Sequence, residues 1–120
     1  MEFRRTRRFT KALKVYRKYR SLPDDIRKLE AVLSAIPEGK GSKHWNCLHT
    51  SEDGNMRVFK VRLSCASMKG ESRFRVIYAH VSGSGTVDLI DFIEIYSKGD
   101  KANEDKGLIG EYIDDPESLF

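Results

Sequence analysis

The sequence predicts an α+β domain in which two N-terminal helices pack on a mainly antiparallel sheet of three to four strands, followed by a short C-terminal helix. Apolar residues recur at helical spacing through residues 6–20 and 23–36. Strand-like runs separated by turn residues then fill residues 45–96. Because the helices precede the strands instead of alternating with them, this order favours an α+β layer over a parallel sheet. A chain of 120 residues fits one domain, 1–120.

Both N-terminal helices have start and stop signals. Thr6 is a suitable N-cap for the first helix, and Pro23 suits the first turn of the second. Pro37 and Gly39 end the second helix. We expect the two helices to form an antiparallel hairpin that covers one face of the sheet and leaves the other face partly open.

The remaining pattern predicts a meander of strands. Turn residues cluster at 52–55, 67–72 and 82–85. A third helix is expected at residues 102–113, and a loose acidic tail at 114–120. The expected strands are residues 3–5, 45–49, 56–65, 73–81 and 86–96.

Charge is unevenly distributed along the chain, although the net charge is only +4. Nine of the 22 basic residues lie in residues 1–20, and ten of the 18 acidic residues lie in residues 88–120. A basic front with an acidic end favours a protein that docks a polyanion on one side. A solvated helix followed by a solubilising tail explains the same distribution equally well.

Other sequence features argue against a membrane protein or a metal protein. No apolar run approaches the ~20 residues that span a bilayer, and no secretory signal pattern follows the basic N-terminus. We therefore expect a cytoplasmic protein without membrane contact. Cys47 and Cys65 are expected to be reduced, because two cysteines provide neither a zinc site nor a disulfide framework.

Cations are interleaved with apolar residues on two of the expected strands. Lys60 and Arg62 share one face of the strand at 56–65, and Arg73 and Arg75 share one face of the next strand. If both pairs face the same way, four like charges cluster, an arrangement that persists best where an anion binds. The alternative is that these cations protect a solvent-facing or edge strand from aggregation.

The segments that carry these residues resemble the RelE/ParE toxin superfamily of type II toxin–antitoxin systems. The resemblance includes RRTRRFTKALKVYRK, FKVR, FRVIYA and EIYSKGDKANED, and so covers most of the chain. It implies a RelE-like fold and a small toxin neutralised by a cognate antitoxin in a hetero-oligomer. The RelE branch cleaves mRNA on the ribosome without metal or cofactor. In that reaction the 2′-hydroxyl attacks the adjacent phosphate and leaves a 2′,3′-cyclic phosphate.

The resemblance assigns catalytic roles to four residues. Lys60 falls on a strand lysine that acts as base or charge stabiliser, and Arg62 falls where a second lysine stabilises phosphate charge. Arg75 falls on the strand arginine that grips the scissile phosphate. Lys98 matches a basic residue at the end of the last strand.

Two positions depart from the RelE pattern. Gly99 stands where RelE has a further catalytic arginine, and Asp105 stands where it has a tyrosine that stacks on a base. Lys101 could replace the arginine, and Tyr96 or Tyr112 could supply the aromatic ring. The residues expected to contact RNA are Arg73, Lys101, Tyr96, Arg7, Arg8 and Lys11.

Two other functions remain open at this point. The departures suit a non-catalytic RelE-fold protein that binds RNA or an antitoxin. The basic first helix suits a ParE-like inhibitor of DNA gyrase, which acts by protein contact.

Several other polar and aromatic residues are weighed as site candidates. A histidine could transfer protons near neutral pH. For each histidine here, however, a structural or surface role is expected over a catalytic one. The carboxylates of the last strand are expected to pair with cations or face solvent, and Trp45 is expected to anchor the core or a loop. The histidines are His44, His49 and His80, and the carboxylates are Asp88, Asp91 and Glu94.

Overall fold

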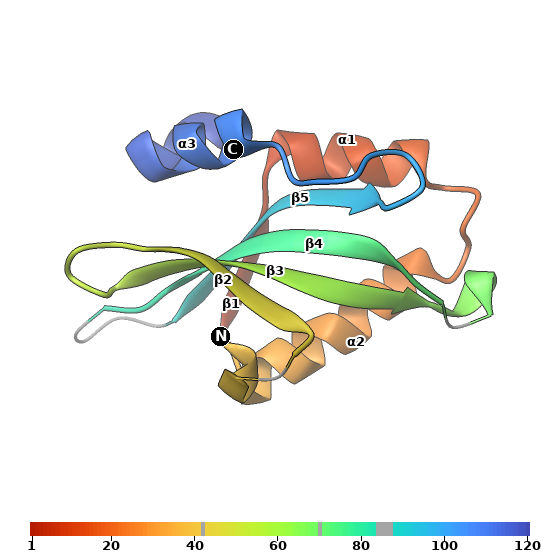
Figure 1. Cartoon of the computed structure of the whole chain (residues 1–120), viewed down its shortest axis with the longest axis horizontal. Coiled ribbons are helices and arrows are strands. Elements are labelled where there is room, and N and C mark those ends of the chain that lie inside the picture. The colour runs from red at the N-terminus through yellow and green to blue at the C-terminus, as the bar shows by residue number, and fades with distance from the viewer. Residues whose placement is uncertain (42, 70, 84–87) are drawn as a thin grey trace.

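The computed structural model describes residues 1–41, 43–69, 71–83 and 88–120 and confirms the α+β fold. Within these residues, one mixed sheet has the strand order β1-β5-β4-β3-β2 (Figure 1). The strands are β1 (Glu2–Arg5), β2 (Trp45–Thr50), β3 (Met56–Cys65), β4 (Glu71–Val81) and β5 (Leu89–Ser97), and the helices are α1 (Arg7–Val15), α2 (Leu22–Ala35) and α3 (Lys106–Asp114).

The sheet has five strands in the described residues, not the three to four expected. The additional strand is β1, which pairs in parallel with β5 while the other neighbours are antiparallel. Four residues of strand-like sequence do not reveal a partner almost ninety positions away, so this pairing could not be read from the chain. Residues 84–87 of the expected last turn and strand lie outside the described residues.

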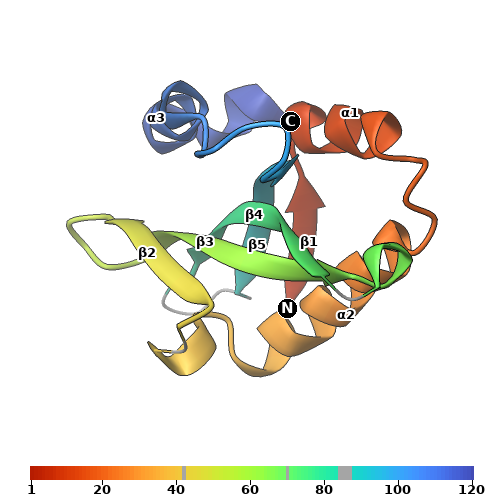
Figure 2. The ribbon, with the colours of Figure 1, turned by 45° about the vertical axis from the view of Figure 1, so that its right-hand side comes forward.

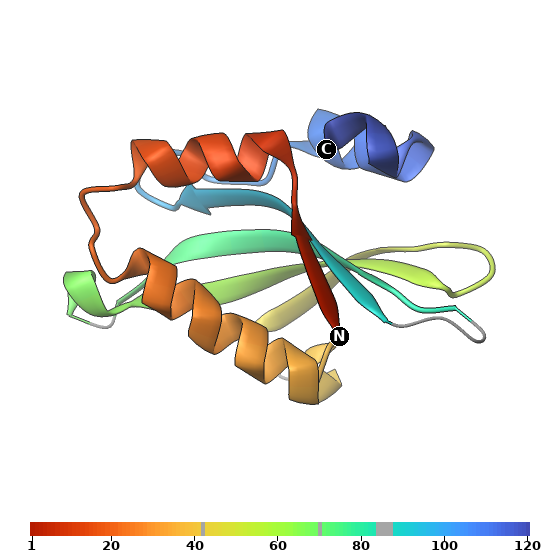
Figure 3. The ribbon, with the colours of Figure 1, turned by 180° about the vertical axis from the view of Figure 1, so that it is seen from behind.

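The two N-terminal helices cover different parts of one sheet face (Figure 3). α1 packs mainly on β5 and α2 mainly on β3, so the contact between helices expected of a hairpin is minor. Thr6 is the N-cap of α1, and its hydroxyl both accepts from the Phe9 amide and donates to the Ile93 carbonyl at 2.8 Å. That second bond ties the start of α1 to β5.

Strand alternation sends the apolar residues of β3 and β4 toward these helices, as expected. The larger of two apolar clusters forms there and includes Phe9, Leu33, Val61, Phe74 and Phe92, all buried. The opposite face has its own, smaller cluster, in which Leu108 and Tyr112 of α3 pack over β3, β4 and β5. Figure 2 shows α3 and α2 on opposite sides of the sheet. Among α1, α2 and α3, only α3 packs on this second face.

Residues 114–120 do not form the loose tail predicted from their acidity. Pro116–Leu119 is a 3₁₀ turn, and Leu119 is only 9% exposed. Arg7 donates to the carbonyls of Ser118 and Phe120 at 2.9 and 2.6 Å. The basic N-terminal segment therefore holds the C-terminus in place. Arg7, which was predicted to contact RNA, thus has a structural role in these two bonds.

A buried carboxylate joins the first strand, the last strand and the last helix. Asp91 on β5 accepts from Arg4 Nε and Nη2 at 2.8 and 3.0 Å and from the Tyr112 hydroxyl at 2.6 Å. The bonds to Asp91, more than the Glu117 charge, raise the pKa of Arg4. The expectation that Asp91 pairs with a cation is confirmed. None of the helices in the described residues is long and apolar enough to cross a membrane.

Replacement of Asp91 by Asn tests this network. Asp91 is 1% exposed and Arg4 is 32% exposed, so the substitution leaves a half-buried guanidinium without its main partner. We expect the free energy of unfolding in urea to fall by about 2–4 kcal/mol. Glu117→Gln is the matched control, because Glu117 pairs with the same Arg4 but is 71% exposed. It should cost less than about 1 kcal/mol. Equal losses would contradict this role of Asp91.

Candidate functional site

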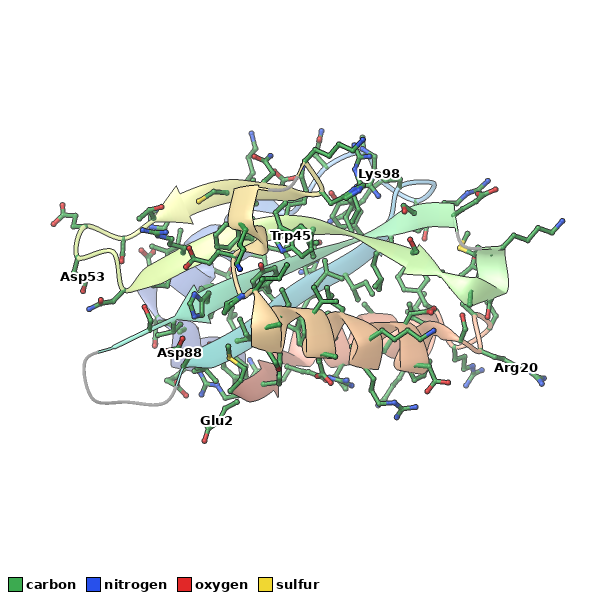
Figure 4. All side chains as sticks on the ribbon, turned by 90° about the horizontal axis from the view of Figure 1, so that it is seen from below. Glu2, Arg20, Trp45, Asp53, Asp88 and Lys98 are labelled. Carbon is green, nitrogen blue, oxygen red and sulfur yellow. The ribbon has the colours of Figure 1, made fainter. Side chains whose placement is uncertain are left out.

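Three of the four predicted strand cations, Lys60, Arg62 and Arg75, line one pocket on the sheet face opposite α1 and α2, whereas Arg73 does not. In the register of β3 and β4, Arg62 lies directly opposite Arg75, and Lys60 lies opposite Ile77. Since β4 has neighbours on both sides and β3 is flanked by β2 and β4, neither is an edge strand of the sheet. The cations therefore do not serve as edge protection. Lys98 follows β5 and points to the side of the sheet away from α2 (Figure 4).

A pocket with a volume of about 370 Å³ lies among these side chains. Four of its lining residues are the predicted catalytic set, and none of the described residues that line it is acidic. The lining residues are Lys43, His44, Trp45, Asn46, Lys60, Arg62, Arg75 and Lys98.

The two arginines of the pocket are held in different ways. Arg75 is half-buried, and its Nη1 donates to the Ser72 and Phe74 carbonyls at 2.7 and 3.1 Å. Burial and, next, the charge of Arg62 lower the pKa of Arg75. Arg62 is exposed, and the described residues give its guanidinium no hydrogen bond or ion pair. The pocket thus presents one fixed and one unpaired guanidinium to solvent.

Lys60 has a partner that the sequence did not predict. Its Nζ lies 2.9 Å from Glu104 Oε2, and the side chains of Lys60 and Glu104 are 23% and 11% exposed. Burial opposes ionisation of Glu104, but the hydrogen bond from Lys60 and the nearby positive charge outweigh it, so its pKa is lowered. Glu104 is therefore a carboxylate that neutralises Lys60 in this structure.

The segment between β5 and α3, residues 98–105, carries Lys98 and Glu104. Lys98 donates to the Ala102 carbonyl at 2.8 Å. Glu94, which is 3% exposed, accepts from Lys101 Nζ at 2.5 Å and from the Asp105 amide at 3.0 Å. These bonds fix residues 98–105 over the end of β5, and they confirm the prediction that Glu94 pairs with a cation.

The residues predicted to contact RNA do not gather in the pocket. Arg73 pairs with Glu71 at 2.6 Å outside it. A separate cavity of about 420 Å³ between α1 and the end of β5 has Arg8, Lys11, Tyr96 and Lys101 among its lining residues. It also contains carboxylates, whereas no described residue that lines the strand-cation pocket is acidic, so the strand-cation pocket is the better anion site.

The strand β2 contributes residues that sequence reasoning did not assign to the site. Asn46 lies opposite Lys60 in the β2–β3 register. Pairing the two strands of the predicted hairpin could therefore have placed Asn46 beside Lys60. Trp45 lines the pocket and donates from Nε1 to the Tyr78 hydroxyl at 2.9 Å. It is therefore also the anchor that was expected. At Gly39, where φ is +69°, an added Cβ would lie 2.3 Å from the Trp45 ring, so this close approach needs glycine.

The three histidines are placed in different environments. His44 lines the pocket, whereas His49 does not. His80 is 8% exposed and sits between Glu38 at 2.7 Å and Asp88 at 3.0 Å. His80 is thus structural, and Asp88 has a hydrogen-bond partner in the His80 imidazole ring. The two cysteines are free thiols, with Cys47 exposed and Cys65 buried.

In the described part of the chain, no group of three or more His, Cys, Asp or Glu side chains is arranged to hold a metal ion. No known protein family, curated protein or solved structure matches this chain.

Arg62→Gln tests whether the two opposed arginines repel each other. Removing the Arg62 charge should raise the free energy of unfolding at low salt by less than about 1 kcal/mol. The gain should shrink at high salt, because an exposed charge is screened. Arg73→Gln, which removes a charge paired with Glu71, is the matched control and should give no gain. Urea unfolding at low and high ionic strength measures both. A loss of stability for Arg62→Gln at low salt would contradict the repulsion.

Proposed function

We propose that this protein is a RelE-like toxin that binds mRNA at the strand-cation pocket and cleaves it. One observation carries the proposal: Lys60, Arg62, Arg75 and Lys98, which come from three separate parts of the chain, line one pocket with no acidic lining residue in the described chain. These are also the four positions to which the resemblance to RelE assigns catalytic roles. A phosphodiester is the anion that best suits a row of guanidinium and ammonium groups.

The pocket supplies positively charged hydrogen-bond donors, which cleavage of a phosphodiester needs to stabilise charge on the phosphoryl oxygens. The charge that builds on the phosphoryl oxygens is stabilised best by donors already in place. Arg75 is held by two carbonyls of its own strand, and Arg62 lies opposite it. Because the Arg75 guanidinium is already fixed, it can bind a phosphate without large rearrangement, and the unpaired Arg62 guanidinium is free to bind the same phosphate.

In the proposed reaction the ribose 2′-hydroxyl loses its proton to a base in the site, and the 2′-oxygen attacks the adjacent phosphorus. The bond from phosphorus to the 5′-oxygen breaks, and that oxygen takes up a proton. The products are a 2′,3′-cyclic phosphate and a 5′-hydroxyl. His44 lines the pocket and is the side chain type that exchanges protons near neutral pH. Lys60 with its Glu104 partner is the other candidate for this role.

The proposal extends to partners and location. A toxin of this type acts on mRNA at the ribosome in the cytoplasm. It is held inactive by a cognate antitoxin in a hetero-oligomer.

A second function, binding of RNA without cleavage, is favoured by the two departures from RelE. Gly99 offers no cation to the site. Asp105 is committed to a structural role, because it is the N-cap of α3, accepting from the Leu108 amide, and pairs with Arg8 at 3.1 Å. A protein that binds RNA in an Arg75-dependent manner and never cleaves it would be of this second kind.

Arg75→Ala should abolish most of the cleavage. Loss of one preorganised charge donor to the phosphate lowers the rate by about 10²–10³-fold. Cleavage of mRNA is measured with purified protein, with and without ribosomes, and growth arrest is scored on expression in cells. Arg73→Ala removes the same charge two residues earlier on the strand and outside the pocket, and should have a much smaller effect. Equal effects of the two substitutions would remove Arg75 from the proposed site.

The salt dependence of RNA binding measures how many phosphates the protein neutralises. If Lys60, Arg62, Arg75 and Lys98 each neutralise one phosphate of single-stranded RNA, log K should fall with log salt with a slope of about −3. Arg75→Ala should reduce the magnitude of that slope by about 0.7. Binding of a short RNA is measured by fluorescence anisotropy over a salt series. A slope near zero would show that binding does not use these cations.

A further inference from the structure

The hydroxyl of Tyr96 has no partner where one is expected. Tyr96 lies opposite Arg75 in the β4–β5 register, is 3% exposed, and its buried hydroxyl makes no hydrogen bond within the described residues. Buried polar atoms are rarely left this way, because an unmade hydrogen bond is costly. The hydroxyls of three other buried tyrosines all have partners, namely those of Tyr16, Tyr78 and Tyr112.

Tyr96 shares the open face of the sheet with Arg75, its partner in the β4–β5 register, and it also borders the separate cavity between α1 and the end of β5. Lys101 Nζ lies over its ring, 5.1 Å from the centroid. Burial raises the pKa of Tyr96 to about 12, with the charges of Glu104 and Glu94 adding to the rise and that of Arg75 opposing it. At neutral pH the hydroxyl is therefore protonated and available as a donor.

Glu104 lies beside the strand-cation pocket, on Lys60, and is not among the described residues that line it. Its carboxylate lies on Lys60 at 2.9 Å, and it influences the ionisation of Tyr96. A carboxylate and a phosphodiester each carry one negative charge and accept from an ammonium group in the same way. If a phosphodiester displaced the Glu104 carboxylate, Lys60 would still have an anionic partner.

We propose that the Tyr96 hydroxyl is a further hydrogen-bond donor of the phosphate site, covered at rest and used when a phosphodiester displaces the Glu104 carboxylate from Lys60. This inference rests on the proposed function, because it takes the pocket to be a phosphate site. It divides the site into an outer part and an inner part. Arg62, Arg75 and Lys98 are open to the ligand, whereas Lys60 and Tyr96 become available only after Glu104 leaves.

The division has a consequence for what the site binds. A free anion meets the outer cations, but it must still compete with Glu104, which is tethered through residues 98–105 and is always at high local concentration. An RNA strand that contacts the outer cations through neighbouring phosphates presents the competing phosphate at a comparable local concentration. The arrangement therefore favours a polymeric ligand over a single phosphate ion.

Binding of a hexanucleotide with 2′-O-methyl groups at every sugar tests the inference, since this probe cannot be cleaved. Fluorescence anisotropy compares wild type, Glu104→Gln, Tyr96→Phe and the double variant. Glu104→Gln should bind roughly tenfold more tightly, as expected for removal of one charged competitor. Tyr96→Phe should weaken binding roughly fivefold in the Glu104→Gln background and less in wild type, so that the two effects are coupled.

Two matched controls separate this role from a structural one. Tyr112→Phe removes a buried hydroxyl that has a partner, so it should lower the urea midpoint and leave the affinity unchanged. Tyr96→Phe should not lower the midpoint, because its hydroxyl has no bond to lose. Glu71→Gln neutralises a carboxylate paired with a strand cation outside the pocket and should not tighten binding.

The outcomes also separate this inference from the proposed function. One outcome overturns the inference alone: Arg75→Ala weakens RNA binding, but Tyr96→Phe leaves the affinity unchanged both in wild type and in the Glu104→Gln variant. So does an unchanged affinity for Glu104→Gln. Binding that does not respond to Arg75→Ala overturns the inference and the phosphate site together.

Discussion

The opposition of Arg62 and Arg75 across β3 and β4 is the constraint on which the open face depends. It is imposed from the other side of the sheet, where Val61 and Phe74 are buried in the main core. A slip of one residue would turn these apolar side chains to solvent, so the core fixes the register. The same register sets two guanidinium groups opposite each other, although like charges in that position repel. The core thus stabilises an arrangement that the charges alone would not form.

The open face exists because α3 covers only part of it. Two buried carboxylates of β5 position this helix: Asp91 binds Tyr112 within it, and Glu94 binds the amide of Asp105 at its start. The segment 98–105 is therefore short and anchored, and it can reach only the neighbouring end of the strands. Lys98 and Glu104 arrive at the strand cations for this reason.

The sequence predicted the features that depend on local pattern. The strand at 56–65, the Thr6 cap and the shared face of Lys60 and Arg62 follow from periodicity and capping chemistry, and the structure has them as expected. Contacts between distant segments were not predictable in this way. Glu104 on Lys60 joins residues 44 positions apart, and the parallel pairing of β1 depends on β5. The C-terminal segment was predicted to be a loose tail because it is acidic, but its partners Arg4 and Arg7 lie more than a hundred residues away in the sequence.

Two locally unfavourable features coincide at one place, the opposed arginines and the unpartnered Tyr96 hydroxyl. Each could be an accident of packing if it stood alone. They are, however, neighbours in register, since Arg75 lies between Arg62 on one side and Tyr96 on the other. Both would be relieved by the same event, the arrival of an anion that accepts hydrogen bonds from all three side chains. Departures from local rules are expected mainly where a protein binds or reacts, which is why these neighbouring residues are the ones to test as an anion site.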